Sequence, residues 1–186
     1  MSLTSVIRVL KTNKGPAIAA GALSLATLGS LALAAQDKYM LQVPNGPAFA
    51  DIRGYEDWLA VAPSQPEGAL KLILGNPTII EAYRSGIPGN GKPFPEGSKL
   101  AKIVYSAKPN PNAPFAVNVP DTLKEVEFIE KDSKKYPDTH GWAYATFVYD
   151  AATDTFTPKG NDAKCGAQCH ERAAATDFIF TQYAKR

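Results

Sequence analysis

Short blocks of alternating apolar and polar residues run through the middle of the chain and predict β-strands. Polar, glycine-rich or proline-rich segments separate the blocks, and the last block is dense in aromatic and β-branched residues. The expected strands are Leu70–Leu74, Ser98–Ala107, Leu123–Glu130 and Trp142–Tyr149. Their connections are too short for parallel crossovers, so an antiparallel sheet is expected.

Helical spacing of apolar residues is confined to a few segments. Residues 55–62 predict a helical turn that runs into a strand, and residues 78–85 predict a short helix after the breaker at 75–77. The alanine-rich segment 169–183 lacks Gly and Pro and predicts a C-terminal helix. Together these elements indicate an α+β fold, an antiparallel β-sheet with flanking helices.

The N-terminus carries a different pattern. Arg8, Lys11 and Lys14 precede an uncharged apolar run, 16–35, that ends in small residues. This arrangement is typical of an export signal peptide, so we expect residues 1–35 to be a cleaved signal peptide and 36–186 to form one domain. The alternative is an uncleaved membrane anchor, because the run approaches the length that spans a bilayer.

Composition excludes some functional classes. Of the 186 residues, 45% are hydrophobic and 20% are charged, which are ordinary values for a globular domain and not for a disordered one. The formal net charge is only +2, and three of the basic residues lie in the N-terminal segment. No charge excess indicates a nucleic-acid partner.

Both cysteines lie in one short motif, Cys165-Gly-Ala-Gln-Cys169-His170. In an oxidising compartment two cysteines commonly form a disulfide, but this loop would be small and His170 would have no role. A zinc site has too few ligands of the usual kind, since His140 is the other histidine in the chain. These two alternatives leave part of the motif unexplained.

Covalent haem attachment accounts for all three residues of the motif. In the C-x-x-C-H pattern of exported proteins, two thiols bond to the haem and the adjacent histidine binds its iron. Here one additional residue separates Cys165 from Cys169, which departs from that pattern. Haem c with iron held by His170 is therefore the favoured interpretation, and a disulfide remains the alternative.

The surroundings of the motif resemble the cytochrome P-460 family. The resemblance rests on Cys169-His170 followed by Thr176-Asp177 and Phe180-Thr181, and on three earlier segments in the same order as in the family. Those segments are Phe94–Gly97, Lys131–Lys134 and Gly141–Tyr144. The similarity extends from about Tyr55 and implies that 36–186 is a mono-haem domain of an exported, dimeric cytochrome.

The resemblance also implies a lysine that is bonded to the haem macrocycle. Counting from the glycine of the Phe94–Gly97 turn places it at Lys102, in the middle of an expected strand. The pattern alone leaves two alternatives open. Lys99 at the start of that strand is a rival, and Lys102 could be a solvated lysine on an edge strand.

Three further positions follow from the same comparison. Glu127 occupies the place of a carboxylate in the pocket on the open side of the haem, although the strand pattern alone puts it at the surface, opposite Val126 and Phe128. Lys71 stands where the family has an arginine. His140 is expected to be a loop residue.

The expected function follows from the axial ligands. His170 is the one axial ligand that the sequence offers, so the sixth position of the iron is expected to be open to a small nitrogen compound. The resemblance implies hydroxylamine oxidation in the periplasm, with Glu127 as general base, Lys102 cross-linked and electrons passed to an external acceptor. Nitric oxide binding without catalysis is the alternative, and an exported domain without haem is a third.

Overall fold

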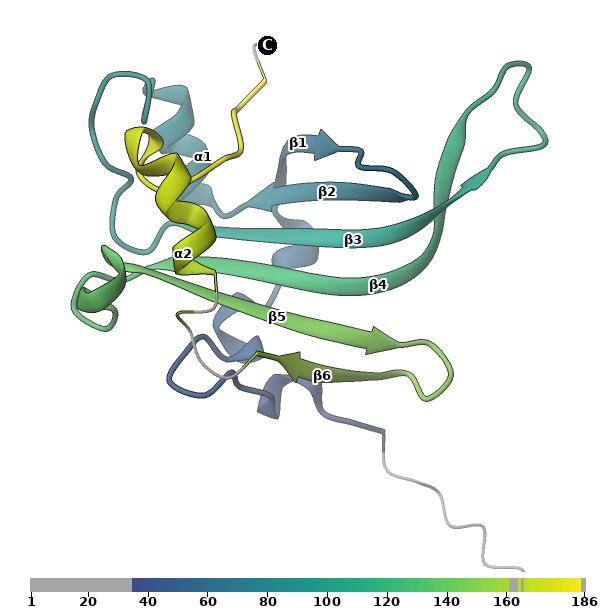
Figure 1. Cartoon of the computed structure of the whole chain (residues 1–186), viewed down its shortest axis with the longest axis horizontal. Helices are drawn as coiled ribbons and strands as arrows, with labels where there is room; N and C mark the ends of the chain where they lie inside the picture. The colour runs from purple at the N-terminus through teal and green to yellow at the C-terminus, as the bar shows by residue number, and fades with distance from the viewer. Residues whose placement is uncertain (1–34, 161–163, 165, 185–186) are drawn as a thin grey trace, which may run out of the picture. The chain divides into compact units, whose positions relative to one another are not determined.

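The computed structural model describes residues 35–160, 164 and 166–184. Their centre is a six-stranded antiparallel sheet in which each strand pairs with the next one along the chain (Figure 1). The α+β fold with an antiparallel sheet is therefore confirmed. The strands are β1 (Leu59–Ser64), β2 (Ala69–Gly75), β3 (Lys99–Pro109), β4 (Asn118–Lys131), β5 (Trp142–Asp150) and β6 (Thr155–Lys159).

Helix α1 (Pro77–Arg84) confirms the helix expected at 78–85 and begins where local chemistry dictates. Asn76 caps it by accepting a hydrogen bond from the Ile79 amide at 3.1 Å, and Pro77 occupies the first turn, where no amide donor is needed. The Asn76 side chain also accepts from the Lys99 amide at 3.1 Å. The helix start is thereby attached to the start of β3.

The predicted C-terminal helix over 169–183 is only partly correct. Helix α2 (Ala167–His170) continues as a 3-10 helix, η5 (Glu171–Thr176), and helical structure ends there. Asp177 and Phe178 have left-handed backbone angles, with φ of 50° and 64°. The carboxylate of Asp177 bonds to a distant lysine, Lys131, so tertiary contacts override the helical preference of this segment.

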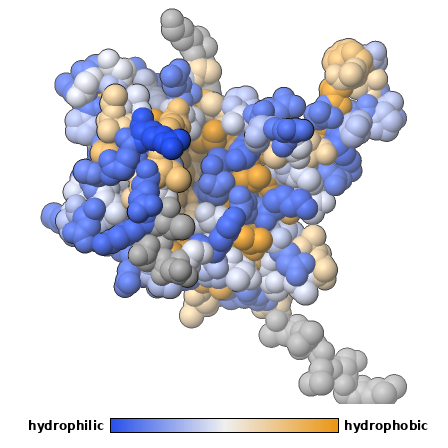
Figure 2. Space-filling model, in the orientation of Figure 1, coloured by the Kyte–Doolittle hydropathy of each residue, from blue (hydrophilic) through white to orange (hydrophobic). Residues whose placement is uncertain are grey.

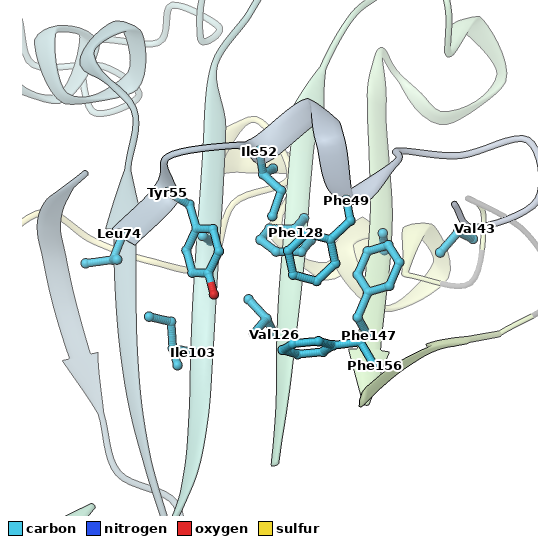
Figure 3. Packing of buried hydrophobic residues seen from close by; sticks show 12 residues of the cluster. Val43, Phe49, Ile52, Tyr55, Leu74, Ile103, Val126, Phe128, Phe147 and Phe156 are labelled. Carbon is cyan, nitrogen blue, oxygen red and sulfur yellow. The ribbon is translucent and has the colours of Figure 1, made fainter. Parts of the chain in front are cut away.

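A three-turn segment covers one face of the sheet, defined here as the N-terminal face. It comprises η1 (Lys38–Met40), η2 (Phe49–Ile52) and η3 (Tyr55–Asp57). Phe49 is fully buried and packs 4.9 Å from Phe147 between ring centres (Figure 3). Apolar side chains fill this face, including Ile52, Tyr55, Leu74, Ile103, Val126, Phe128 and Phe156.

Helices α1 and α2 lie over the other face, defined here as the cavity face (Figure 1). A second apolar cluster occupies one end of it and includes Ile79, Ile80, Phe94, Leu100, Trp142 and Ile179. Figure 2 shows this side of the molecule, where hydrophobic residues are exposed among hydrophilic ones. The sheet therefore has one face that is filled with apolar side chains and one that is only partly covered.

The described residues test neither expectation for the N-terminus, the cleaved signal peptide or the membrane anchor. The signal peptide expected at 1–35 lies outside the described residues, apart from its last position, and stays a prediction. Within the described ranges, none of the helices has the length and hydrophobicity required to span a bilayer.

Candidate functional site

A row of directly opposed residues crosses five strands on the cavity face. Ile73 on β2 pairs with Lys102 on β3, which pairs with Glu127 on β4. Glu127 in turn pairs with Thr146 on β5, and Thr146 pairs with Lys159 on β6. Because opposed residues in an antiparallel sheet project to the same side, this register brings five side chains into one line.

Lys102 and Glu127 form an ion pair in the middle of this row. Lys102 Nζ lies 2.6 Å from Glu127 Oε2, and 32% and 27% of the two side chains is exposed. The interpretation of Lys102 as an edge-strand lysine is wrong, because β3 is an interior strand paired on both sides. The placement of Glu127 at the surface is also wrong, because α2 and the C-terminal segment partly cover the face opposite Val126 and Phe128.

His170 is held by α2 above the same row. Its Nδ1 lies 2.6 Å from the carbonyl oxygen of Phe178. A carbonyl only accepts, so Nδ1 is the donor and Nε2 keeps its lone pair. The rings of Tyr144 and Phe180 lie 4.5 Å and 4.9 Å from the imidazole, between centres, and fix its orientation.

The surroundings of His170 favour its neutral imidazole, chiefly because the side chain is buried. Burial lowers its pKa below the ordinary value, and the positive charge of Lys102 acts in the same direction. The Phe178 carbonyl and the negative charge of Glu127 oppose these effects without reversing them. A neutral imidazole with a free Nε2 is the form that binds a metal ion.

Lys102, Glu127 and His170 line one cavity of about 230 Å³. The rest of the row contributes Ile73, Thr146 and Lys159, and the C-terminal segment contributes Phe180 and Thr181. The other residues that line the cavity are Leu100, Phe128, Ile129, Tyr144, Ala145 and Gly166. An apolar wall with a few convergent polar groups is the usual composition of a cofactor or substrate site.

The model of the Cytochrome P460 family matches residues 52–181 of this chain. The chain belongs to the cytochrome P460 family. It is accordingly a mono-haem c-type cytochrome, and its cofactor is covalently bound haem c with iron. A search of curated proteins finds no match to this cytochrome.

The residues around the cavity fit a haem. His170 presents the neutral nitrogen that iron requires, and Cys169 is exposed with a free thiol in the described part of the chain. Phe180 lines the cavity yet is 55% exposed, so it offers an apolar surface for a macrocycle to cover. Cys165, the other expected attachment point, lies outside the described residues.

Gly166 shows how closely the start of α2 approaches the sheet. A Cβ added there would lie 2.5 Å from the ring of Tyr144, far inside van der Waals contact. Glycine at this position therefore allows α2 to lie against β5. The sequence motif alone carries no indication of this requirement.

Other residues that the sequence singled out lie away from the cavity. Lys71 lines a separate surface groove beside β1, so it does not take the place of an arginine in this pocket. Two arginines are also engaged outside the cavity: Arg53 stacks on Tyr39, 3.6 Å from its ring centre, and Arg84 pairs with Glu81. His140 is in a loop as expected.

Sequence reasoning missed Thr146 and Lys159, which complete the row. Both depend on the register of β5 and β6, and β6 was not predicted because Thr155–Lys159 is short and contains Pro158. The ring of His140 also stacks on Phe178, 4.3 Å between centres and 10° from parallel. Only tertiary structure reveals this contact.

Proposed function

We propose that this cytochrome is exported to the periplasm and oxidises hydroxylamine, passing the electrons to an external acceptor. The observation that carries the proposal is the Lys102–Glu127 pair, 2.6 Å apart on the wall of the cavity that His170 also lines. A residue on this wall that accepts or donates protons would assist catalysis. A protein that only carries electrons does not need such a residue. When bound, haem iron would supply ligand binding and electron transfer.

Each residue of the chain has a distinct part in this proposal. His170 would hold the iron through Nε2, and Cys165 and Cys169 would attach the macrocycle through their sulfur atoms. Oxidation of hydroxylamine to nitric oxide releases three electrons and three protons, so the site needs a proton acceptor. Glu127 is the carboxylate available for that role on the cavity wall, and a positioned base contributes about 10²–10⁴ in rate.

Lys102 connects the cofactor to the base. A bond from Lys102 Nζ to a macrocycle carbon would replace one N–H and one C–H bond, releasing two protons and passing two electrons to an external oxidant. It would use the nitrogen that now faces Glu127 and would remove the charge partner of that carboxylate. Glu127 would then be free to accept protons from substrate. The cross-link and the basic role of Glu127 are therefore coupled in this proposal.

The optical spectrum of the reduced protein, produced with the c-type maturation machinery, tests the cross-link. A strongly red-shifted Soret band without sharp c-type bands is expected, and Lys102→Ala should restore ordinary bands. Ordinary high-spin c-type bands in the unmodified protein would move the function to nitric oxide binding without turnover. In that case Lys102 would remain paired with Glu127 in the holoprotein instead of bonding to the macrocycle.

Turnover with hydroxylamine and an artificial electron acceptor tests the base. Glu127→Gln should lower kcat by about 10²–10⁴ while the spectrum stays unchanged. Glu125→Gln is a matched control, because Glu125 lies on the same strand and pairs with Lys159 but does not line the cavity. If kcat falls no further in Glu127→Gln than in Glu125→Gln, Glu127 is not the base.

The proposed assembly is a homodimer, on the strength of the family resemblance. Sedimentation analysis of the purified holoprotein should give twice the monomer mass. A monomer that retains full turnover would show that the proposed chemistry needs one chain alone.

A further inference from the structure

A buried ion pair lies behind the segment that holds His170. Lys131 Nζ is 2.5 Å from Asp177 Oδ2, and only 6% and 13% of the two side chains is exposed. The ammonium also lies 5.1 Å from the ring centre of Trp142. Charges buried to this extent are costly without a partner, so each fixes the other in place.

The Asp177 carboxylate connects three segments of the chain. Its Oδ2 accepts the bond from Lys131 at the end of β4 and another from the backbone amide of Phe94, at 2.7 Å. Asp177 itself directly follows η5. The end of the sheet, the 86–97 loop and the C-terminal segment therefore meet at one oxygen atom.

This connection stabilises an unfavourable backbone. Asp177 and Phe178 both have positive φ, a conformation that is rare for bulky side chains and persists only where the surroundings impose it. The Phe178 amide donates to the carbonyl of Ala173 at 2.8 Å, which closes the turn. The chain then leaves the helix direction instead of continuing it.

The turn determines where the Phe178 carbonyl points. In a continuing helix that carbonyl would accept from the amide four residues later and would face away from His170. In the observed turn it accepts from His170 Nδ1 at 2.6 Å. The hydrogen bond to the imidazole therefore exists because the helix ends at Asp177.

We propose that Asp177, paired with Lys131, is a positioning residue for the iron ligand. It holds the Phe178 carbonyl against His170 Nδ1, which directs Nε2 into the cavity and increases the electron donation of the imidazole to iron. The inference rests on the proposed role of His170 as axial ligand. It assigns a function to a buried ion pair that does not touch the cavity.

Resonance Raman spectroscopy of the ferrous holoprotein tests the inference, because the iron–histidine stretching band reports imidazole basicity directly. Asp177→Asn keeps an acceptor for the Phe94 amide but removes the charge that Lys131 requires. The band should shift to lower frequency, the midpoint potential should rise, and substrate turnover or nitric oxide affinity should fall on the order of 10-fold.

The Asp177→Asn protein would keep the buried charge of Lys131 without a partner, which could prevent folding. A second variant avoids this problem. Lys131→Met combined with Asp177→Asn removes both charges and should give the same shift. The control is Glu130→Gln, which breaks a comparably buried ion pair with Lys99, 2.9 Å, on the opposite face of the same strand. This control should leave the band unchanged.

The outcomes separate this inference from the proposed function. If the unmodified protein shows a normal iron–histidine band and neither Asp177 variant shifts it, the positioning role is overturned, whatever the substrate is. A shift in the Glu130→Gln control of equal size would also overturn it, since any lost ion pair would then suffice. An unmodified protein without an iron–histidine band would overturn the ligand assignment of His170 and this inference with it.

Discussion

The two faces of the sheet use the same strands for opposite purposes. On the N-terminal face, Ala101, Ile103, Val126 and Phe128 project into an apolar cluster that Phe49 fills. On the cavity face, the neighbouring positions on the same two strands carry Lys102 and Glu127. One face therefore supplies the stability that allows the other to hold a charged row and an unfilled cavity, as is typical of functional sites.

The largest expected effect on stability comes from removing a buried aromatic ring from the N-terminal face. Phe49→Ala should lower the free energy of unfolding by about 3–5 kcal/mol, because Phe49 is fully buried and contacts five aromatic rings. Chemical denaturation of the holoprotein measures this. Phe115→Ala, at a position that is 71% exposed, should change stability by less than ~0.5 kcal/mol.

A smaller effect is expected where the start of α2 meets the sheet. Gly166→Ala should cost about 1–3 kcal/mol and shift the absorption bands, because the new methyl group must displace Tyr144 or α2. Gly89→Ala is the control, since its nearest neighbour would be 3.4 Å from the added carbon. Denaturation and the visible spectrum together check the prediction, and an unshifted spectrum would show that α2 tolerates the movement.

Replacing the charged pair should affect stability still less. Lys102→Met combined with Glu127→Leu is expected to change the free energy of unfolding by under ~1.5 kcal/mol, because an apolar pair of similar volume replaces a partly buried ion pair. Hydroxylamine turnover should be lost in the same protein. A large loss of stability would instead make the row part of the structural core.

The smallest effect concerns the Phe94–Gly97 turn and its dependence on pH. Hydrogen bonds from Ser133 lower the pKa of Glu96 below 4.5, its ordinary value. Glu96 therefore stabilises the fold above that pH, and the contribution is lost as pH falls through the lowered pKa.

Glu96→Gln should accordingly cost less than ~1 kcal/mol at neutral pH and nothing in strong acid, because the carboxylate is exposed. Denaturation midpoints measured from pH 7 to pH 3 would detect the difference. Glu67→Gln, an exposed position between β1 and β2, should show no such trend. A parallel trend in both variants would refute the role of Ser133.

The strands were predictable from local sequence, because Ser98–Ala107 alternates with period two and Trp142–Tyr149 is dense in aromatic and β-branched residues. The same local logic placed helix α1, since Asn76 and Pro77 mark its start. Family resemblance singled out Lys102, Glu127 and His170. The structure brings all three to one cavity, and their chemical roles stay predictions.

The remainder of the site depends on contacts between distant segments. Alternation placed Glu127 at the surface because the pattern identifies the less apolar face and not whether another segment covers it. The end of the C-terminal helix depends on Lys131, which lies 46 positions before Asp177 in the chain. Apolar residues at 178–180 predicted a helix face, and the structure uses Phe178 and Phe180 to hold His170 instead.

The long hairpin of β3 and β4 contains irregularities in register on either side of Tyr105. They lie between the Lys102–Glu127 row and the outer loop at 110–117, and each one lets a strand bend without moving the pairs beyond it. A change in the length of that loop would therefore be absorbed at the outer end of the hairpin (Figure 1). Loop length and cavity chemistry can thus diverge independently during evolution, so relatives with longer or shorter arms can retain the same charged row.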